Sequence, residues 1–322
     1  MMEKMQKNLE MRKNKATATT ISLNCIAANE VLKMIETNVL LELHEKVTIS
    51  GLLTNAESWT LNRGETTELE KIEIQALKYL FDLPSHTPTP ALIFTFGTLY
   101  TSHRMDQKRL NYLHRILIRE DQHWTKKAFH RLESMNLGWS KSIKETLVDY
   151  NLPTDFAEIK SFTIRQWSKI VKDKVEVKNK GRLYDDCHKI VNGAREVKTK
   201  TASIVNVLNS DYYERKPCEE ILLCTKQETK TIMIARFGML ECGRNFKGSA
   251  SITCNDCGTI DDEEHRLNHC KKFRAINYYD HDDKIPFTNI YSNDITVLRD
   301  IIPKIENVWS TNCAHGTMKK EH

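Results

Sequence analysis

Four residues in the C-terminal part of the chain have the types and the spacing of a metal site: Cys254, Cys257, His265 and Cys270. Two cysteines separated by two residues form a pair of thiolates, and a histidine and a third cysteine shortly afterwards can complete a tetrahedral set. Zn²⁺ prefers thiolate and imidazole ligands, and four protein ligands leave no open position for a substrate. The pattern therefore predicts a structural Zn²⁺ site with a Cys₃His ligand set.

The identity of the fourth ligand stays open, because His269 neighbours Cys270 and could replace it in a Cys₂His₂ set. Seven residues separate Cys257 from His265, fewer than the roughly twelve of a DNA-reading zinc finger. Scattered thiols at the start of a helix are the alternative to a metal site. A paired cysteine knuckle beside a histidine and a third cysteine rarely arises by accident, so the metal site is favoured.

Cations and aromatic residues flank the metal site on both sides. Cationic side chains and an aromatic ring on a small rigid metal module are how zinc knuckles hold single strands. The alternatives are that the aromatic rings pack the core of the module and that the acids from 261 to 264 oppose a phosphate-facing surface. The residues predicted to contact RNA or single-stranded DNA here are Arg244, Phe246, Lys247, Lys271 and Lys272.

A second basic region lies between residues 160 and 200. It holds twelve Lys or Arg and five Asp or Glu, a charge of 12 − 5 = +7, whereas the whole chain carries +5. A basic helical face can lie along phosphates, with an affinity that falls as salt rises. The solvated face of a helical connector explains the composition equally well. Lys169 and Lys172 are the predicted nucleic-acid contacts. The helical spacing of the aromatic residues Phe162, Trp167 and Tyr184 predicts core positions rather than stacking on bases.

Composition limits the class of protein. The 322 residues are enough for two or three domains, and no run reaches the roughly eighteen apolar residues of a membrane helix. The charged N-terminus lacks the apolar core of a secretory signal. We therefore expect an intracellular protein, nuclear or cytoplasmic and without membrane contact, whose nine cysteines bind metal or lie buried as thiols.

The sequence offers little for catalysis. Residues 183–186 read LYDD, which resembles the polymerase box whose paired carboxylates hold two Mg²⁺ ions. The aromatic residue is out of register by one, and the flanks are lysine-rich and helical. There is no P-loop, no His-Glu-x-x-His and no serine nucleophile elbow. We expect a protein that is not an enzyme, and helical His103, His114 and His188 to be packed or surface residues rather than ligands.

Apolar residues recur at helical spacing nearly everywhere, and the chain has only eleven glycines and seven prolines. We therefore expect a mainly α fold, with a helical domain over 1–153, a basic helical connector over 154–226, and a zinc module with a C-terminal helix over 227–322. Thr67 and Glu70 have the spacing of a capping box and predict a helix start. Pro303 should kink or split the last helix.

Five short stretches occur in an order that is more specific than any one of them. They are LLTNAESW at 52–59, the helix 69–80 with TPTPA at 87–91, FGTL at 96–99, RLNYLHRIL at 109–117, and ARFGML at 235–240 followed by NFK and the Cys₃His site. Together they resemble the part of a non-LTR retrotransposon reverse transcriptase that follows the palm. Thr54 and Asn55 depart from the family pattern, because they stand where it usually has an aromatic residue and a glycine.

The resemblance implies a thumb-like first domain that grips the template–primer backbone through the basic stretch and through Arg104, Lys108, Arg109 and Arg115. The family carries out RNA-templated DNA synthesis for target-primed integration. Its fingers and palm, with the metal-binding aspartates, would lie before Met1, so a separate polymerase domain would have to complete the enzyme. We expect a truncated, non-catalytic protein that binds RNA or single-stranded DNA. The alternative is a zinc-stabilised protein-interaction module without nucleic-acid binding.

Overall fold

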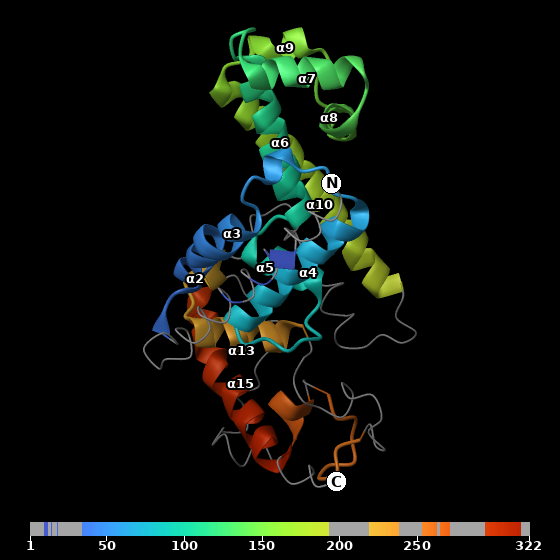
Figure 1. The fold of residues 1–322 in the computed structure, drawn as a ribbon. Coiled ribbons are helices and arrows are strands. Elements are labelled where there is room, and N and C mark those ends of the chain that lie inside the picture. The colour runs from blue at the N-terminus through green and yellow to red at the C-terminus, as the bar shows by residue number, and fades with distance from the viewer. Residues whose placement is uncertain are drawn as a thin grey trace. The chain divides into compact units, whose positions relative to one another are not determined.

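A computed structural model of the chain describes residues 34–192, 219–237, 253–262, 265–270 and 294–316, with the single residues 10, 11, 14 and 18. The described residues are mainly helical, which confirms the predicted fold class (Figure 1). Their only β pairing consists of two isolated bridges, Glu36 with Thr225 and Thr253 with Ile260. Within these ranges, no helix combines the length and the apolar character needed to cross a membrane.

The helical elements are named as in Figure 1. They are α2 (Thr37–Leu43), the π-helix η2 (His44–Ile49), α3 (Ser50–Leu52), the 3₁₀-helix η3 (Ala56–Ser58), α4 (Arg63–Leu80), α5 (Thr89–Phe96), α6 (Thr101–Leu117), α7 (Trp124–Ser134), α8 (Gly138–Asp149), α9 (Phe156–Ser161), α10 (Ile164–Asn192), α12 (Glu219–Leu222), α13 (Lys226–Arg236), the π-helix η6 (His265–His269) and α15 (Ile295–Gly316).

The chain forms two compact units. Unit 1 comprises Met1–Thr19, Glu45–Ala76 and Thr98–Asp185, and unit 2 comprises Thr20–His44, Leu77–Gly97 and Asp186–His322. The two units alternate along the sequence, and each draws on residues from both sides of position 153. The division into three consecutive domains stays a prediction.

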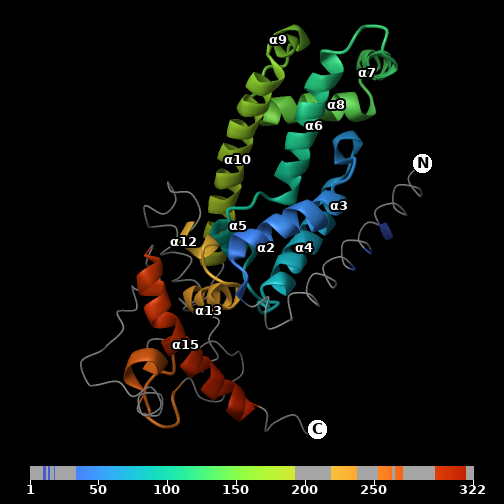
Figure 2. The ribbon, with the colours of Figure 1, turned by 90° about the vertical axis from the view of Figure 1, so that its left-hand side faces the viewer.

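Unit 1 has its main core between α6 and α10, which lie side by side (Figure 2). Helix α10 buries Trp167, Val171 and Val175 at intervals of four residues, so one stripe of the helix faces the core. The Trp167 ring is almost fully buried, and its Nε1–H donates to the Leu110 carbonyl of α6 (3.0 Å). Trp167 is therefore a core residue, as its spacing predicts, and partly buried Phe162 packs against the same core. Burial of a large apolar side chain such as that of Trp167 stabilises a fold by about 1.5–3 kcal/mol. The prediction of a core position was wrong for Tyr184, whose ring is 43% exposed.

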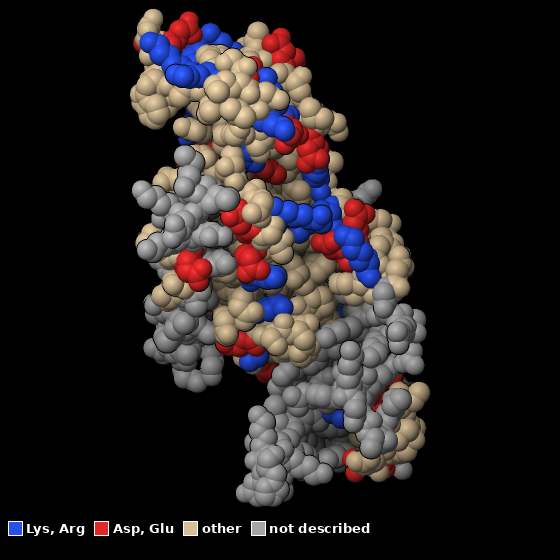
Figure 3. Space-filling view, turned by 45° about the vertical axis from the view of Figure 1, so that its right-hand side comes forward, with Lys and Arg blue, Asp and Glu red and all other residues tan. Residues whose placement is uncertain are grey.

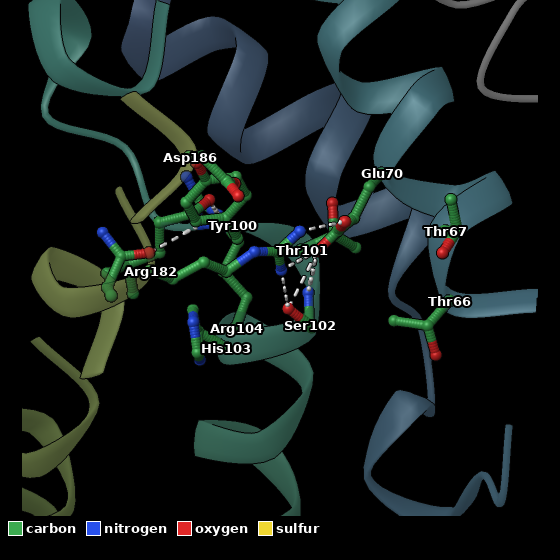
Figure 4. Close-up of polar contacts among 12 residues, drawn as sticks. Thr66, Thr67, Glu70, Tyr100, Thr101, Ser102, His103, Arg104, Arg182 and Asp186 are labelled. Atoms are coloured by element: carbon green, nitrogen blue, oxygen red, sulfur yellow. Dashed lines mark hydrogen bonds and ion pairs between the residues drawn. The ribbon is translucent and has the colours of Figure 1, made fainter. Parts of the chain in front are cut away.

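Two carboxylates of α4 complete the N-terminus of α6, where the N-cap residue makes no side-chain bond to the helix. Ser102 donates to Glu70 through its N–H (3.3 Å) and its hydroxyl (2.8 Å), and the Thr101 hydroxyl donates to Glu73 (Figure 4). Negative charge is favourable at this end because the backbone dipoles leave it partly positive. Burial raises the pKa of Glu73 above its usual value, although Arg104 and Thr101 act against it.

The start of α4 differs from the prediction, because the helix begins at Arg63 and not at the capping box expected at Thr67. Asn62 Oδ1 accepts the Glu65 N–H (2.9 Å), and the Asn62 N–H donates to Glu65 Oε2 (2.8 Å). The predicted box was wrong because Asn and Glu at the same spacing cap the helix one turn earlier, which adds backbone hydrogen bonds. The Thr67 hydroxyl instead donates to the Arg63 carbonyl (2.8 Å).

The turn before η3 contains Asn55, at the position where the stretches that residues 52–59 resemble usually have a glycine. Asn55 has φ +59° and ψ +20°, which is the left-handed region that favours glycine. Asparagine tolerates this region better than most residues. The tight turn therefore forms without a glycine, and Leu53 before it is fully buried in a small cluster with Leu69 and Met105.

Unit 2 is built around α13. The Thr37 N–H of α2 donates to the Cys224 carbonyl (2.8 Å), and a capping box between Thr225 and Glu228 starts α13. Helix α15 packs against α13, with Arg299 Nε 3.1 Å from Glu228 Oε1, and it also contacts η6. Helix α15 is one continuous element through Pro303, so of the two predicted effects, a kink or a split, the split does not occur.

Candidate metal centre

The four predicted ligands come together in unit 2. One ligand atom from each of Cys254, Cys257, His265 and Cys270 lies within 4.8 Å of all the others. Cys254, His265 and Cys270 are buried, and Cys257 is half-buried. His269 is exposed and lies outside the cluster, which contains Cys270. These residues are therefore positioned to hold a metal ion.

A tight turn presents the first two thiols. The Gly258 N–H donates to the Cys254 carbonyl (2.8 Å), and the Cys254 N–H donates to the Thr259 carbonyl (2.7 Å). Gly258 has φ +70°, a conformation that strains residues with a side chain. The antiparallel bridge between Thr253 and Ile260 closes the turn. The CxxCG sequence thus forms a knuckle with both thiols near each other.

The π-helical turn η6 begins at one of the other two ligands, His265, and ends just before the second, Cys270. In an α-helix, residues five positions apart lie about 140° apart around the axis. Here the Cys270 N–H donates to the His265 carbonyl five residues earlier (2.7 Å), which widens the turn and brings the two residues to one side. Asp262 Oδ1 accepts the His265 N–H (2.8 Å) and so fixes where the turn begins.

The sulfur positions fit Zn²⁺. Cys270 Sγ lies 3.8 Å from Cys254 Sγ and 3.8 Å from Cys257 Sγ, far longer than a disulfide bond of about 2.05 Å. A tetrahedral zinc ion bound to sulfur at about 2.3 Å has sulfur–sulfur edges of about 3.8 Å. Three thiols and one imidazole also form a donor set that suits this ion.

Polar residues around the four predicted ligands orient them through hydrogen bonds and an ion pair. The Thr259 hydroxyl lies 3.0 Å from Nδ1 of His265, and a partner at one ring nitrogen orients a ligand histidine. Arg266 and Asp261 form a bidentate ion pair, and both side chains are largely buried. Arg266 Nε donates to Asp261 Oδ1 (2.6 Å), and Arg266 Nη2 donates to Asp261 Oδ2 (2.6 Å). Sequence reasoning missed these supporting residues. Only the three-residue spacing from Asp262 to His265, typical of a helix cap, gave a signal.

The five flanking residues predicted to contact nucleic acid lie outside the described residues. They are Arg244, Phe246, Lys247, Lys271 and Lys272. Their placement relative to the metal ligands therefore stays a prediction.

Lys169 and Lys172 are described, and both are exposed on α10. With Arg165 they follow the i, i+4, i+7 spacing of one helix face, opposite to Trp167. Lys172 Nζ lies 3.7 Å from Glu176 Oε1. Among the described residues, Arg165 and Lys169 have no ion-pair partner. On the face drawn in Figure 3, Lys and Arg side chains are interspersed with Asp and Glu.

Two other cations of the basic stretch make hydrogen bonds and aromatic contacts inside unit 1. Lys178 Nζ donates to the Asp149 carbonyl (2.9 Å) and lies 4.9 Å from the centre of the Tyr150 ring. Arg182 makes two bonds to Glu70 (2.7 and 2.8 Å) and stacks over Tyr100 at 3.9 Å (Figure 4). Burial alone would raise the pKa of Glu70, but the bonds and charge of Arg182, with Ser102, hold it below its usual value.

The resemblance assigns four cations to contacts with the template–primer backbone. Two of them are bound by other side chains of unit 1, and two are exposed. Arg104 is held by Glu45 and Glu73, and buried Arg109 donates to Ser142 Oγ (2.8 Å) and lies 3.4 Å from Asp106. Their charges support the fold of unit 1. Lys108 and Arg115 are exposed, although Lys108 also donates to the Leu53 carbonyl (3.3 Å).

The histidines of α6 pack inside unit 1. His103 Nδ1 lies 2.6 Å from the Tyr150 hydroxyl, which donates to Asp106 Oδ2 (3.0 Å). Burial, aided by the charge of Arg182, lowers the pKa of His103 to about 4, so its ring is neutral at physiological pH. His114 Nε2 lies 3.0 Å from the Phe162 carbonyl, and its ring stacks on Trp167. The paired aspartates 185 and 186 lie within α10, a helical setting.

A scan against protein-family models finds no match to this chain, and searches of curated proteins and of solved structures find none either. Function is therefore inferred from the residues and their geometry.

Proposed function

We propose that the chain binds RNA or single-stranded DNA without catalysing a reaction, through exposed cations on α10 and a zinc-stabilised C-terminal module. The exposed row of Arg165, Lys169 and Lys172 is the observation that carries the proposal. It spans roughly 10 Å of helix, at 1.5 Å per residue. Trp167 and Val171 anchor the opposite face in the core, so the row is held on a rigid support.

The proposed metal is a structural Zn²⁺ held by Cys254, Cys257, His265 and Cys270. When bound, it would supply a cross-link between the CxxC knuckle and η6, with no open position for a substrate. Binding of such a metal is coupled to local folding. The chain's own residues hold the ligands in place: Gly258 permits the knuckle turn, and Asp262 fixes the start of η6.

The proposed origin is the region that follows the palm of a non-LTR retrotransposon reverse transcriptase, acting with a separate polymerase domain. The order of the five sequence stretches supports it. Two structural features agree with that order: Asn55 keeps the left-handed turn of the first stretch, and the 109–117 stretch lies on α6 with Leu110, Leu113 and Leu117 in the core.

A second candidate is a zinc-stabilised module that binds another protein. One observation favours it: the charge of Arg266, beside the metal ligands, is neutralised by Asp261. Asp256 and Asp262 add negative charge to the same short segment. A surface of this composition does not attract phosphates.

The test is fluorescence anisotropy of a labelled single-stranded RNA with the full chain, at about 50 mM and about 200 mM salt. The variant Lys169→Glu/Lys172→Glu should bind more than tenfold more weakly at low salt and with a shallower salt dependence. Lys46→Glu/Lys71→Glu is the control, because it reverses the same charge at two exposed lysines of η2 and α4. Equal losses in both variants, or salt-independent binding, would contradict the proposal and favour the protein-binding module.

A further inference from the structure

One aromatic side chain in unit 1 is exposed in a way that packing does not explain. Trp124, the first residue of α7, is 73% exposed, whereas tryptophan is highly buried on average. We propose that the exposed face of α7 is a second site for single-stranded nucleic acid, in which Trp124 stacks on an unpaired base. This inference rests on the proposed function and names a site on α7, an element other than α10 and the metal module.

The residues beside Trp124 fix the position of its ring, the surface on which a base would stack. His123 is the N-cap of α7, and its ring stacks on that of Trp124 with centroids 6.0 Å apart and an interplanar angle of 26°. The His123 ring is itself fixed, because Nδ1 lies 2.7 Å from the Thr125 hydroxyl and Nε2 lies 2.9 Å from Arg119 Nη1. A preset aromatic surface loses little conformational entropy when a base stacks on it. Arg119 also places a cation at the edge of this surface.

Cations continue along the same face of the helix. Trp124, Lys127 and Arg131 follow the i, i+3, i+7 spacing of one face, and all three are exposed. The Lys127 ammonium donates to the neutral Gln122 amide (2.6 Å), and Arg131 has no ion-pair partner in the part of the chain that the structure describes. The row spans roughly 10 Å. An aromatic ring with cations beside it matches a base and its neighbouring phosphates.

Nearby acids are mostly paired within unit 1. Asp121 Oδ1 lies 2.7 Å from Lys126 Nζ, and Glu133 contacts His130 (3.2 Å) and Lys144 (3.1 Å). Exposed Glu120 is the remaining acid of the segment from 119 to 131. From 115 to 133 the chain has three acids, at 120, 121 and 133, and four Lys or Arg that are not buried, at 115, 119, 127 and 131, so this surface carries a small net positive charge.

The buried side of α7 is used for packing within unit 1. Phe129 is buried, with its ring centroid 5.9 Å from Trp139 and 5.4 Å from Phe156. An interfacial helix needs a free apolar face to enter the lipid. The exposed side of α7 carries Trp124, Lys127 and Arg131, and Leu132 and Met135 are also exposed there (38% and 55%). The cations beside the aromatic ring favour a polyanion that also offers flat bases.

The experiment compares two labelled oligomers of equal length with the full chain by fluorescence anisotropy: an oligouridylate and an abasic sugar–phosphate oligomer. Trp124→Ala should weaken oligouridylate binding about tenfold and leave the abasic oligomer unaffected, because only the base stacks. Trp124→Phe should restore most of the affinity. Lys127→Glu/Arg131→Glu should weaken both oligomers. Tyr79→Ala, which truncates a half-exposed aromatic ring of α4, is the control and should change neither.

Three results would overturn the inference. If Trp124→Ala binds oligouridylate as tightly as the parent chain while Lys169→Glu/Lys172→Glu loses binding, the α7 site is wrong and the proposed function stands. If the parent chain binds neither oligomer, the α7 site and the proposed function are both wrong. If Trp124→Ala instead abolishes binding to phosphatidylserine vesicles and leaves oligouridylate binding intact, α7 contacts lipid.

Discussion

The Sγ atoms of Cys254 and Cys270 lie 3.8 Å apart although the residues are sixteen positions apart in the sequence. The separation is too long for a disulfide and equals the edge of a tetrahedral thiolate site. The knuckle and η6 each form through local hydrogen bonds, and two side-chain contacts link them, Thr259 with His265 and Asp261 with Arg266. A metal ion bound by all four ligands would also join them.

Loss of one ligand should therefore release the metal and unfold its surroundings. Cys257→Ser is expected to purify without zinc and to lose the structure of residues 253–270, because metal binding and local folding are coupled. Elemental analysis gives the metal content, and circular dichroism should show that most helix remains, since the core of unit 1 contains no metal ligand. Cys187→Ser, at a buried thiol on α10, should keep its zinc. Retention of zinc by Cys257→Ser would contradict the ligand assignment.

Cys270 and His269 give opposite predictions although they are neighbours. Cys270 belongs to the cluster and is fully buried, whereas the His269 side chain is exposed. Cys270→Ser should lose zinc, and His269→Ala should bind one zinc ion per chain with unchanged affinity in a chelator competition. Zinc loss from His269→Ala would show that the Cys₂His₂ set is the real one.

His103 should make the stability of unit 1 depend on pH. Its pKa is about 4 in the folded chain and near 6.5 when unfolded, so the unfolded state binds the proton first. Stability is then complete above about pH 6.5 and falls as the pH drops towards 4, by about 3 kcal/mol at most. Urea unfolding across this range should show a shallower pH dependence for His103→Gln than for the parent chain. Parallel curves for the two proteins would mean that His103 does not titrate as stated.

Trp167 and Tyr184 lie on the same helix and should respond differently to truncation. Trp167→Ala empties a filled core position and removes the indole donor to the Leu110 carbonyl, so it should cost about 3–5 kcal/mol of unfolding free energy. Tyr184→Ala, at a ring that is 43% exposed, should cost less than about 1 kcal/mol. Chemical unfolding followed by circular dichroism measures both. Similar losses in the two variants would argue against Trp167 as a core anchor.

The metal ligands and the buried face of α10 could be predicted because their signals are local. The CxxC spacing and the four-residue recurrence of Trp167, Val171 and Val175 are visible in a short window of sequence. The left-handed turn at Asn55 could have been predicted too, since asparagine is one of the few residues that tolerate it.

Distant partners could not be predicted. Glu70 appeared to be half of a capping box, yet it binds Arg182, which lies 112 positions later. For the same reason the charge count of the basic stretch exceeds the number of unpaired cations on the surface. Lys178 pairs with Asp149, and Arg182 pairs with Glu70. Charge counts along a sequence do not show which cations form ion pairs within the fold.

The most direct test of the account combines metal content with nucleic-acid binding on one purified sample of the full chain. Zinc is measured by elemental analysis, and anisotropy with a labelled single-stranded RNA is measured at about 50 mM and about 200 mM salt. We expect one zinc ion per chain and an affinity that falls steeply as salt rises. A chain that contains no zinc, or one that holds zinc but does not bind the RNA at either salt concentration, would contradict it.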